Sequence, residues 1–431
     1  MSGRPTVCVI GGGPAGMIAA GRAAEMGAAV VLLEQNRALG RKLLITGGGR
    51  CNVTNAVSDR HVLVSRYGAH AEALHSVFAR FSPLDMRGLL RRFGLDTVEE
   101  AEGRVFPVTQ KASSVRDALA AYLRAGAVEV RTAVRVRALI AAADDAGSSG
   151  KTITAAQLAD GNIVEADRFI LATGGVSRPE TGSTGDGFAW VRDLGATVRY
   201  PQPSLVPIRV VEAWPLALQG LSIGNARLSV FLDGARQFAM TGKLLFTHFG
   251  LSGPVVLNLS QRINELAQGG PVTIAIDPLP DEDGGAVDRR LQAILAESPK
   301  KQLGNVVGRL VPARMASVVL DLAAVDPATP CSELARTARR AVVDTVKSLR
   351  VTFDGLLGTD RAVVSSGGVS PRDVDFTTMT LKATPNLAVV GDMLDFDRQS
   401  GGYSLQLCWS TGWVAGSAAA ASAATASPAV G

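Results

Sequence analysis

Apolar runs and small-residue turns at the start of the chain predict a strand–helix–strand unit. Residues 6–10, "TVCVI", form a short apolar run typical of a buried parallel strand. Residues 14–26 begin with proline and stop before Gly27, which is the pattern of a helix. Residues 28–34, "AAVVLLE", predict a second buried strand that ends at Glu34. This order of elements is the repeating unit of parallel α/β sheets.

The pattern stays mixed over the next part of the chain. Ser82 is expected to cap a helix over residues 83–93, and Ser113 or Ser114 a helix over 115–126. Strand material is then expected at 127–142, a turn at 142–151, and a hairpin followed by a buried strand at 152–175.

The pattern changes from about Tyr200. Short strands separated by Gly and Pro favour an antiparallel barrel or sandwich up to about residue 280. Residues 283 to about 350 are helical in pattern. A buried strand and a glycine-opened helix follow near the C-terminus. The order α/β, β, α, α/β predicts one α/β domain that is interrupted by an insertion.

The first strand and helix are joined by a motif that binds dinucleotides. Gly11, Gly13 and Gly16 form GxGxxG: the first allows a tight turn, the second lets backbone approach a pyrophosphate, and the third lets helix and strand pack closely. Unpaired N–H groups at the helix N-terminus favour the phosphates. Glu34, at the end of the next strand, is suited to accept the ribose hydroxyls.

Two later segments indicate which dinucleotide binds. Residues 168–175, "RFILATGG", and 384–392, "TPNLAVVGD", are buried strands that end in small residues, and the second delivers Asp392 for a ribitol hydroxyl. Together with GxGxxG they resemble the three fingerprints of two-dinucleotide-binding-domain flavoproteins. The predicted cofactor is therefore FAD, and NADH or NADPH is a possible transient electron donor.

Residues 40–55, "GRKLLITGGGRCNVTN", belong to a larger resemblance. With "PSLVPI", "GLSGPVVLNLS", "GGV" at 367–369 and "GGYSLQLCWSTGWVAG", they are similar to bacterial FAD flavoproteins of the aminoacetone-oxidase-like and bile-acid-operon reductase type. Separately, "TGSTGDGFAWVRDLGA" resembles a segment of the fumarate-reductase flavoprotein superfamily. The resemblance spans essentially the whole chain. It implies a Rossmann-type FAD-binding domain interrupted by an inserted β-barrel domain with a helical subdomain.

The expected domain bounds follow from this combination. The FAD-binding domain takes 1–196 and 367–431, the β-rich insertion 197–280, the helical subdomain 281–350, and a return strand of the insertion 351–366.

The cofactor site is expected to draw on these segments together. In the resemblance, the three glycines at 47–49 let backbone run beside the cofactor, three cations offset phosphate charge or bind an anionic substrate, Asn52 reaches the flavin edge, and Val136 lies against adenine. The expected cofactor-binding residues are Gly11, Gly13, Pro14, Ala15, Gly16, Glu34, Gln35, Arg41, Lys42, Thr46, Gly47, Gly48, Gly49, Arg50, Asn52, Val136, Thr173, Gly174, Gly391, Asp392, Gly401, Gly402, Tyr403, Ser404 and Leu405.

Catalytic acids and bases are less clearly marked. His248 and Tyr403 are the candidates for proton transfer, and no general acid is assigned. Cys51 is expected to pack as a small side chain, because no partner base is identifiable. The four cysteines lack metal-ligand spacing, so no metal site is expected.

Charge, hydropathy and cysteine usage indicate the cellular location and the kinds of partner to expect. The net charge is +5, from 44 basic and 39 acidic residues, and it is scattered along the chain. No signal peptide or apolar run of membrane-spanning length is seen, and the cysteine usage suits a reducing compartment, so a cytoplasmic location is expected. A small-molecule substrate is expected, with no membrane and no specific nucleic acid as partner.

Three functions remain open. The first is NAD(P)H-dependent reduction of a conjugated carbonyl or similar small organic acceptor through the flavin. The second is an aminoacetone-type amine oxidase that makes hydrogen peroxide. The third, supported only by the positive net charge, is a flavin-bearing redox-sensing or nucleic-acid-binding protein.

Overall fold

The computed structural model divides the chain into two compact units. The first comprises Met1–Pro203 with Val363–Gly431, and the second comprises Ser204–Ala362. The structure describes residues 4–68, 70–142, 151–358 and 364–421. Of the turn expected at 142–151, residues 143–150 lie outside the described residues.

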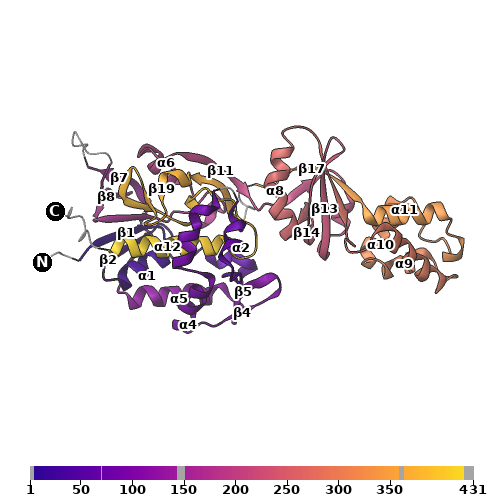
Figure 1. The fold of residues 1–431 in the computed structure, drawn as a ribbon, viewed down its shortest axis with the longest axis horizontal. Helices are drawn as coiled ribbons and strands as arrows, with labels where there is room; N and C mark the ends of the chain where they lie inside the picture. Colours follow the sequence, from indigo (N-terminus) through magenta and orange to yellow (C-terminus); the bar gives the residue numbers. More distant parts are fainter. Residues whose placement is uncertain (1–3, 69, 143–150, 359–363, 422–431) are drawn as a thin grey trace. The chain divides into compact units, whose positions relative to one another are not determined.

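A seven-stranded sheet lies at the centre of the first unit (Figure 1). The strands from β21 to β6 in this order are parallel, and the direction of chain progression reverses between β10 and β1. In such sheets ligands bind in the crevice outside the carboxyl ends of the strands at this reversal. The spatial order is β19 (Val374–Asp375), β20 (Thr380–Leu381), β21 (Thr384–Val389), β10 (Arg168–Leu171), β1 (Thr6–Ile10), β2 (Ala29–Glu34) and β6 (Glu129–Thr132).

Helix α1 (Pro14–Glu25) packs against both α5 (Ala112–Ala125) and α12 (Tyr403–Ala420). The crossing of α1 and α12 is a main-chain contact. A Cβ at Gly412 would lie 2.4 Å from the carbonyl oxygen of Ala15, and one at Gly416 would lie 2.4 Å from that of Ala19. Both pairs advance by four residues, so the two helices run parallel and their N-termini point the same way.

Smaller elements complete the first unit. Three further sheets are formed by β3 (Thr54–Asn55), β5 (Arg104–Pro107) and β4 (Thr97–Glu99), by β7 (Val136–Ala141), β8 (Ile153–Leu158) and β9 (Ile163–Glu165), and by β11 (Val198–Ser204) and β18 (Val364–Val369). The remaining helices are α2 (Arg60–Val64), α3 (His75–Arg80), α4 (Pro83–Arg92) and α6 (Asp186–Asp193).

The two predicted helix caps have different outcomes. Ser82 caps α4 as predicted, because its hydroxyl accepts a hydrogen bond from the Asp85 amide at 3.3 Å. The prediction that Ser113 or Ser114 caps α5 is wrong. That helix begins at Ala112, after Lys111, so both serines lie inside its first turn. The side chain of Ala112 is buried, so the apolar face of the helix begins one residue before the two serines.

A closed barrel forms the second unit together with a group of helices. Around the barrel the strands are β12 (Ile208–Val210), β15 (Gly250–Ser252), β14 (Ala235–Thr247), β13 (Ser222–Leu232), β16 (Val272–Asp277) and β17 (Leu349–Leu356). The helices are α7 (Trp214–Ala217), α8 (Pro254–Leu266), α9 (Gly284–Ala296), α10 (Ala313–Leu322) and α11 (Arg336–Lys347). The predicted Rossmann-type fold with an inserted barrel and helical part is confirmed. Within the described ranges, no helix is long and apolar enough to cross a membrane.

The α1–α12 contact can be tested by the same exchange at two helical glycines. Gly412→Ala should destabilise the protein by about 1–3 kcal/mol, because the new methyl group overlaps the main chain of Ala15. Gly88→Ala in α4 should stabilise it by about 0.5–1 kcal/mol, because nothing lies within 4 Å of that position. Thermal unfolding of both variants measures the difference, and equal melting temperatures would contradict the close crossing.

Candidate functional site

A pocket of about 1160 Å³, counting its open mouth, lies at the carboxyl ends of the parallel strands. Its wall is built from the loops after β1, β2, β6, β10 and β21 and from the N-termini of α1 and α12. Fifteen of the residues expected from the sequence line it: Gly11, Gly13, Pro14, Ala15, Glu34, Gln35, Arg41, Lys42, Thr46, Val136, Thr173, Gly174, Asp392, Ser404 and Leu405.

The glycines of the β1–α1 turn serve different purposes. A Cβ at Gly16 would lie 1.8 Å from the carbonyl oxygen of Gly11, so this position admits no side chain. A Cβ at Gly13 would meet no protein atom within 4 Å, although Gly13 lines the pocket. The space beside Gly13 is therefore open for a ligand at the N-terminus of α1, where unpaired N–H groups favour phosphate.

Glu34 lies at the end of β2 and is buried. One carboxylate oxygen accepts a hydrogen bond from the Gly12 amide at 2.7 Å. The other accepts from the main chain and side chain of Asn36 at 2.7 and 2.6 Å. An ionised carboxylate has about four acceptor positions, so Glu34 keeps one for a ligand hydroxyl.

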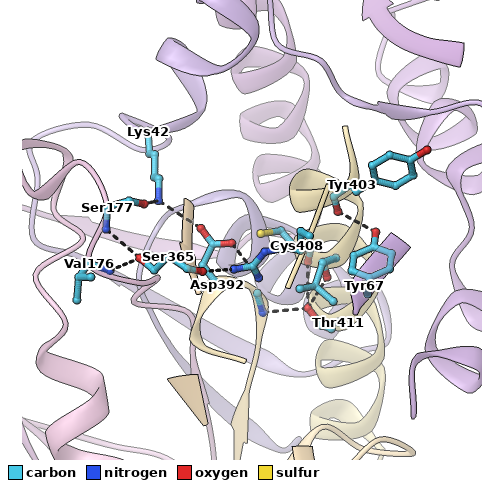
Figure 2. Close-up of polar contacts among 12 residues, drawn as sticks. Lys42, Tyr67, Val176, Ser177, Ser365, Asp392, Tyr403, Cys408 and Thr411 are labelled. Atoms are coloured by element: carbon cyan, nitrogen blue, oxygen red, sulfur yellow. Dashed lines mark hydrogen bonds and ion pairs between the residues drawn. The ribbon is translucent and has the colours of Figure 1, made fainter. Parts of the chain in front are cut away.

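Asp392 lies after β21, on the wall of the pocket, between two cations. Figure 2 shows its contact with one of them, Lys42. One of its carboxylate oxygens is 3.2 Å from the ammonium of Lys42, and the other is 3.6 Å from the guanidinium of Arg398. Burial alone would raise the pKa of Asp392, but Lys42 and Arg398 outweigh it and hold the pKa below its ordinary value. The carboxylate is therefore ionised at neutral pH.

The glycines at 47–49 adopt left-handed backbone conformations, with φ of +56°, +67° and +85°. They do not line the pocket. This turn returns the chain so tightly that a Cβ at Gly47 would lie 2.7 Å from the Asn52 amide nitrogen. Local conformation thus requires glycine here, whether or not a cofactor passes beside it.

Arg50 and Asn52 also lie off the pocket wall. The Arg50 guanidinium pairs with Glu100, donates to the side-chain oxygen of Gln110 at 2.5 Å, and stacks over Phe106 at 4.0 Å. The side-chain oxygen of Asn52 is buried and has no hydrogen-bond partner. The predicted cofactor contacts of these two residues stay predictions.

Another group of expected residues lies just behind the wall, at the start of α12 and beside β21. Gly402 approaches Thr54 so closely that a Cβ would lie 2.4 Å from its carbonyl, which ties α12 to the 50–55 segment. The Tyr403 carbonyl accepts a hydrogen bond from the Tyr67 hydroxyl at 2.8 Å (Figure 2). Burial raises the pKa of Tyr403, so its hydroxyl is protonated at neutral pH. Five expected cofactor-binding residues in this group and in the β1–α1 turn do not line the pocket: Gly16, Gly391, Gly401, Gly402 and Tyr403.

His248 belongs to the barrel unit, after β14, where its ring packs edge-on against Phe249. Its proton-transfer role stays a prediction. The cysteines of the chain are buried and free. Burial raises the pKa of the Cys51 thiol to about 12, in agreement with a packing role.

Several pocket residues were missed from the sequence. Residues 181–184, Asp186 and Trp190 come from the segment that resembles fumarate-reductase flavoproteins, so this resemblance was the available signal. Three further residues do not line the pocket but form a polar network with its residues Lys42 and Asp392: Ser177, Ser365 and Arg398. They carry no motif and come together only in the fold.

The family model for the HI0933-like protein Rossmann domain matches residues 5–418. The chain belongs to this family. HI0933-like proteins are FAD-dependent oxidoreductases, and the orphaned buried atoms at Asp392 and Arg398 together with the open space beside Gly13 fit such a cofactor. The predictions of the family and of an FAD-dependent oxidoreductase are thereby confirmed.

Relatives of the HI0933-like chain differ in substrate. It is 31% identical over 415 residues to a 3-dehydro-bile acid delta(4,6)-reductase of Clostridium scindens, covering 96% of this chain and 98% of the relative. It is 30% identical over 409 residues to a ribosomal RNA dihydrouridine synthase of Escherichia coli K12, covering 94% and 95%. Among solved structures, a 3-ketosteroid delta1-dehydrogenase of Sterolibacterium denitrificans has a TM-score of 0.54 at 13% identity, covering 97% and 100%, and shows the same fold.

The glycine-rich turn gives a direct test of the pocket in this HI0933-like chain. Gly13→Val should leave a folded protein that purifies largely without FAD, because the side chain enters open space where the pyrophosphate is expected. Gly16→Val should fail to fold, because its side chain overlaps Gly11. Flavin absorbance measures the loss of bound FAD, and circular dichroism measures the loss of folded structure. A Gly13→Val protein that is fully yellow would contradict the assignment.

Proposed function

We propose that this chain is an FAD-dependent reductase of a carbon–carbon double bond conjugated to a carbonyl, with a steroid-like enone as its substrate class. The observation that carries the proposal is the similarity over nearly the full length of the chain to a 3-dehydro-bile acid delta(4,6)-reductase. In a 3-oxo steroid, double bonds at positions 4 and 6 are conjugated with the ketone.

Residues of the pocket would hold FAD along its length. Glu34 and Val136 would bind the adenosine, the N-terminus of α1 the pyrophosphate, and Asp392 the ribitol. The N-terminus of α12, with Ser404 and Leu405, would face the flavin ring. When bound and reduced, FAD supplies a hydride. The electrons are proposed to come from NADH or NADPH bound transiently, because the sequence holds one glycine-rich dinucleotide motif.

Saturation of a conjugated double bond also needs a proton at the carbon next to the carbonyl. Tyr403 is the proposed donor, since it opens α12 beside the pocket wall and its raised pKa keeps the hydroxyl protonated. The Tyr67 hydroxyl fixes the main chain of Tyr403, which holds the residue at the helix start.

A second candidate substrate is a uridine in RNA. The supporting observation is the similarity to a ribosomal RNA dihydrouridine synthase, at nearly the same identity and coverage. Dihydrouridine is uridine saturated at a double bond conjugated to a ring carbonyl, so the chemistry at the flavin is the same. The net charge of +5 agrees with a polyanionic partner.

Anaerobic reoxidation of the reduced holoenzyme separates these candidates. The bound FAD is reduced with one equivalent of dithionite and mixed with a 3-oxo-Δ4 steroid or with unmodified ribosomal RNA. We expect the steroid to restore the oxidised flavin spectrum and to gain two hydrogens by mass spectrometry. Reoxidation by RNA alone, with formation of dihydrouridine, would replace the first substrate class by the second.

The amine-oxidase alternative is tested with the oxidised holoenzyme. The reductase proposal is wrong if two results are found together. Aminoacetone bleaches the oxidised flavin and air then yields peroxide, and neither the steroid nor the RNA reoxidises the reduced flavin. NADH and NADPH are each added to separate samples of the oxidised holoenzyme under the same conditions. The nucleotide that bleaches the flavin absorbance is the electron donor.

Removal of the proposed proton donor should slow one step selectively. Tyr403→Phe should lower the rate of reoxidation by the enone about 10²-fold, because it removes the hydroxyl and keeps the ring. The affinity for FAD should stay unchanged. Tyr200→Phe is the matched control, since that side chain is 78% exposed. An unchanged rate for Tyr403→Phe in stopped-flow measurements would exclude the role.

A further inference from the structure

Arg398 is a fully buried arginine whose guanidinium is largely unpaired. Its side chain is 0% exposed, and one nitrogen donates to the carbonyl of Ser365 at 2.8 Å. The other two nitrogens, Nε and Nη1, have no hydrogen-bond partner, and neither has the Asp392 oxygen that faces Nη1 at 3.6 Å. A buried charge is costly unless it is paired and hydrogen-bonded, so this arrangement needs an explanation beyond packing.

Arg398 belongs to a ring of polar groups, of which Lys42 and Asp392 line the pocket. The Lys42 ammonium donates to the Ser177 hydroxyl at 2.7 Å and lies 3.2 Å from Asp392. The Ser177 amide donates to the Ser365 hydroxyl at 3.1 Å, and Ser365 accepts from Arg398 through its carbonyl. Figure 2 shows Lys42, Ser177, Ser365 and Asp392 in this arrangement. Ser365 and Asp392 contact Arg398 directly, and Ser177 and Lys42 link these two residues to each other.

The ring carries excess positive charge. Two cations, Lys42 and Arg398, face the single carboxylate of Asp392. Tyr67 and Cys408 also interact electrostatically with Arg398, but burial raises the pKa of both, so they stay neutral. No further acidic group of the described residues pairs with Arg398. One positive charge is left uncompensated beside Asp392, where the ribitol that carries the flavin ring is expected.

We propose that Arg398 is a positioning and charge-supplying residue that favours the reduced form of the bound flavin. Oxidised FAD takes up two electrons and one proton to give a reduced flavin with a negative charge on its pyrimidine side. An uncompensated buried cation stabilises that anion more than the neutral oxidised ring, because the low-dielectric surroundings screen the interaction weakly. This inference rests on FAD binding and is independent of which substrate the reduced flavin serves.

The midpoint potential of the bound flavin tests the proposal. Holoenzyme is titrated with dithionite against a reference dye, and FAD affinity is measured for both redox states. Arg398→Met should weaken binding of reduced FAD at least tenfold relative to oxidised FAD, which corresponds to a potential lower by about 30 mV for a two-electron couple. Arg398→Lys should restore most of the shift, because it returns the charge without the guanidinium shape.

Asp392→Asn, in the same ring of polar groups, should shift the midpoint potential of the flavin in the opposite direction. Removing the carboxylate leaves both cations uncompensated, so the potential should rise. This variant also keeps the test valid if Arg398→Met does not fold, because an unchanged or lowered potential in Asp392→Asn would overturn the proposal. Arg22→Met is the control, since Arg22 stacks on Trp413 at 4.1 Å and bonds Ser417 near the other end of α12. Its potential should equal that of the unsubstituted protein.

The outcomes separate this inference from the proposed function. Unshifted potentials in Arg398→Met, with a lower melting temperature, would make Arg398 a structural residue only. If the unsubstituted chain binds no FAD, the proposed function fails before the role of Arg398 is reached. If potentials shift as expected but neither enone nor uridine reoxidises the flavin, the proposed function fails and the role of Arg398 stands.

Discussion

The parallel crossing of α1 and α12 is the constraint on which the pocket depends. Because Gly412 sits level with Ala15 and Gly416 with Ala19, the main chains touch and the two helices cannot slide past one another. Helix α12 begins at Tyr403, nine residues before Gly412, so at about 1.5 Å per residue its N-terminus lies about 13 Å beyond the level of Ala15. Two helix N-termini therefore face the same pocket at staggered positions, one suited to phosphate and one to a second electron-rich group.

Local sequence was sufficient for much of the fold. The first strand and helix were predicted at Thr6–Ile10 and from Pro14, because both have strong patterns over a few residues. The same holds for the Ser82 cap, whose partner lies three residues away. The cap of α5 was misplaced because Ala112 is neutral in pattern, and only its burial against the rest of the unit shows that the helix includes it.

Site residues that belong to a sequence motif could be predicted. Site residues that come together only through the fold could not. Gly11, Glu34 and Asp392 lie at or just after the ends of strands with recognisable endings, and all three line the pocket. The glycines at 47–49 were interpreted as room for a ligand, but their left-handed backbone is a sufficient reason for them. Arg398 and Ser365 are joined by a hydrogen bond across 33 positions, which no local pattern reveals.

The way in which the chain leaves and re-enters the first unit has an evolutionary consequence. The Ser370 amide, just after β18, donates to the Thr197 carbonyl, just before β11, at 2.9 Å, so these strands pair with opposite directions. The last residues of β11 and the first of β18 are thus neighbours, and the barrel and its helices are spliced into what is geometrically a hairpin. Such a joint lets natural variation lengthen, trim or exchange the inserted module without disturbing the strand order of the nucleotide-binding core. Different substrates on one redox scaffold are the expected product of that architecture.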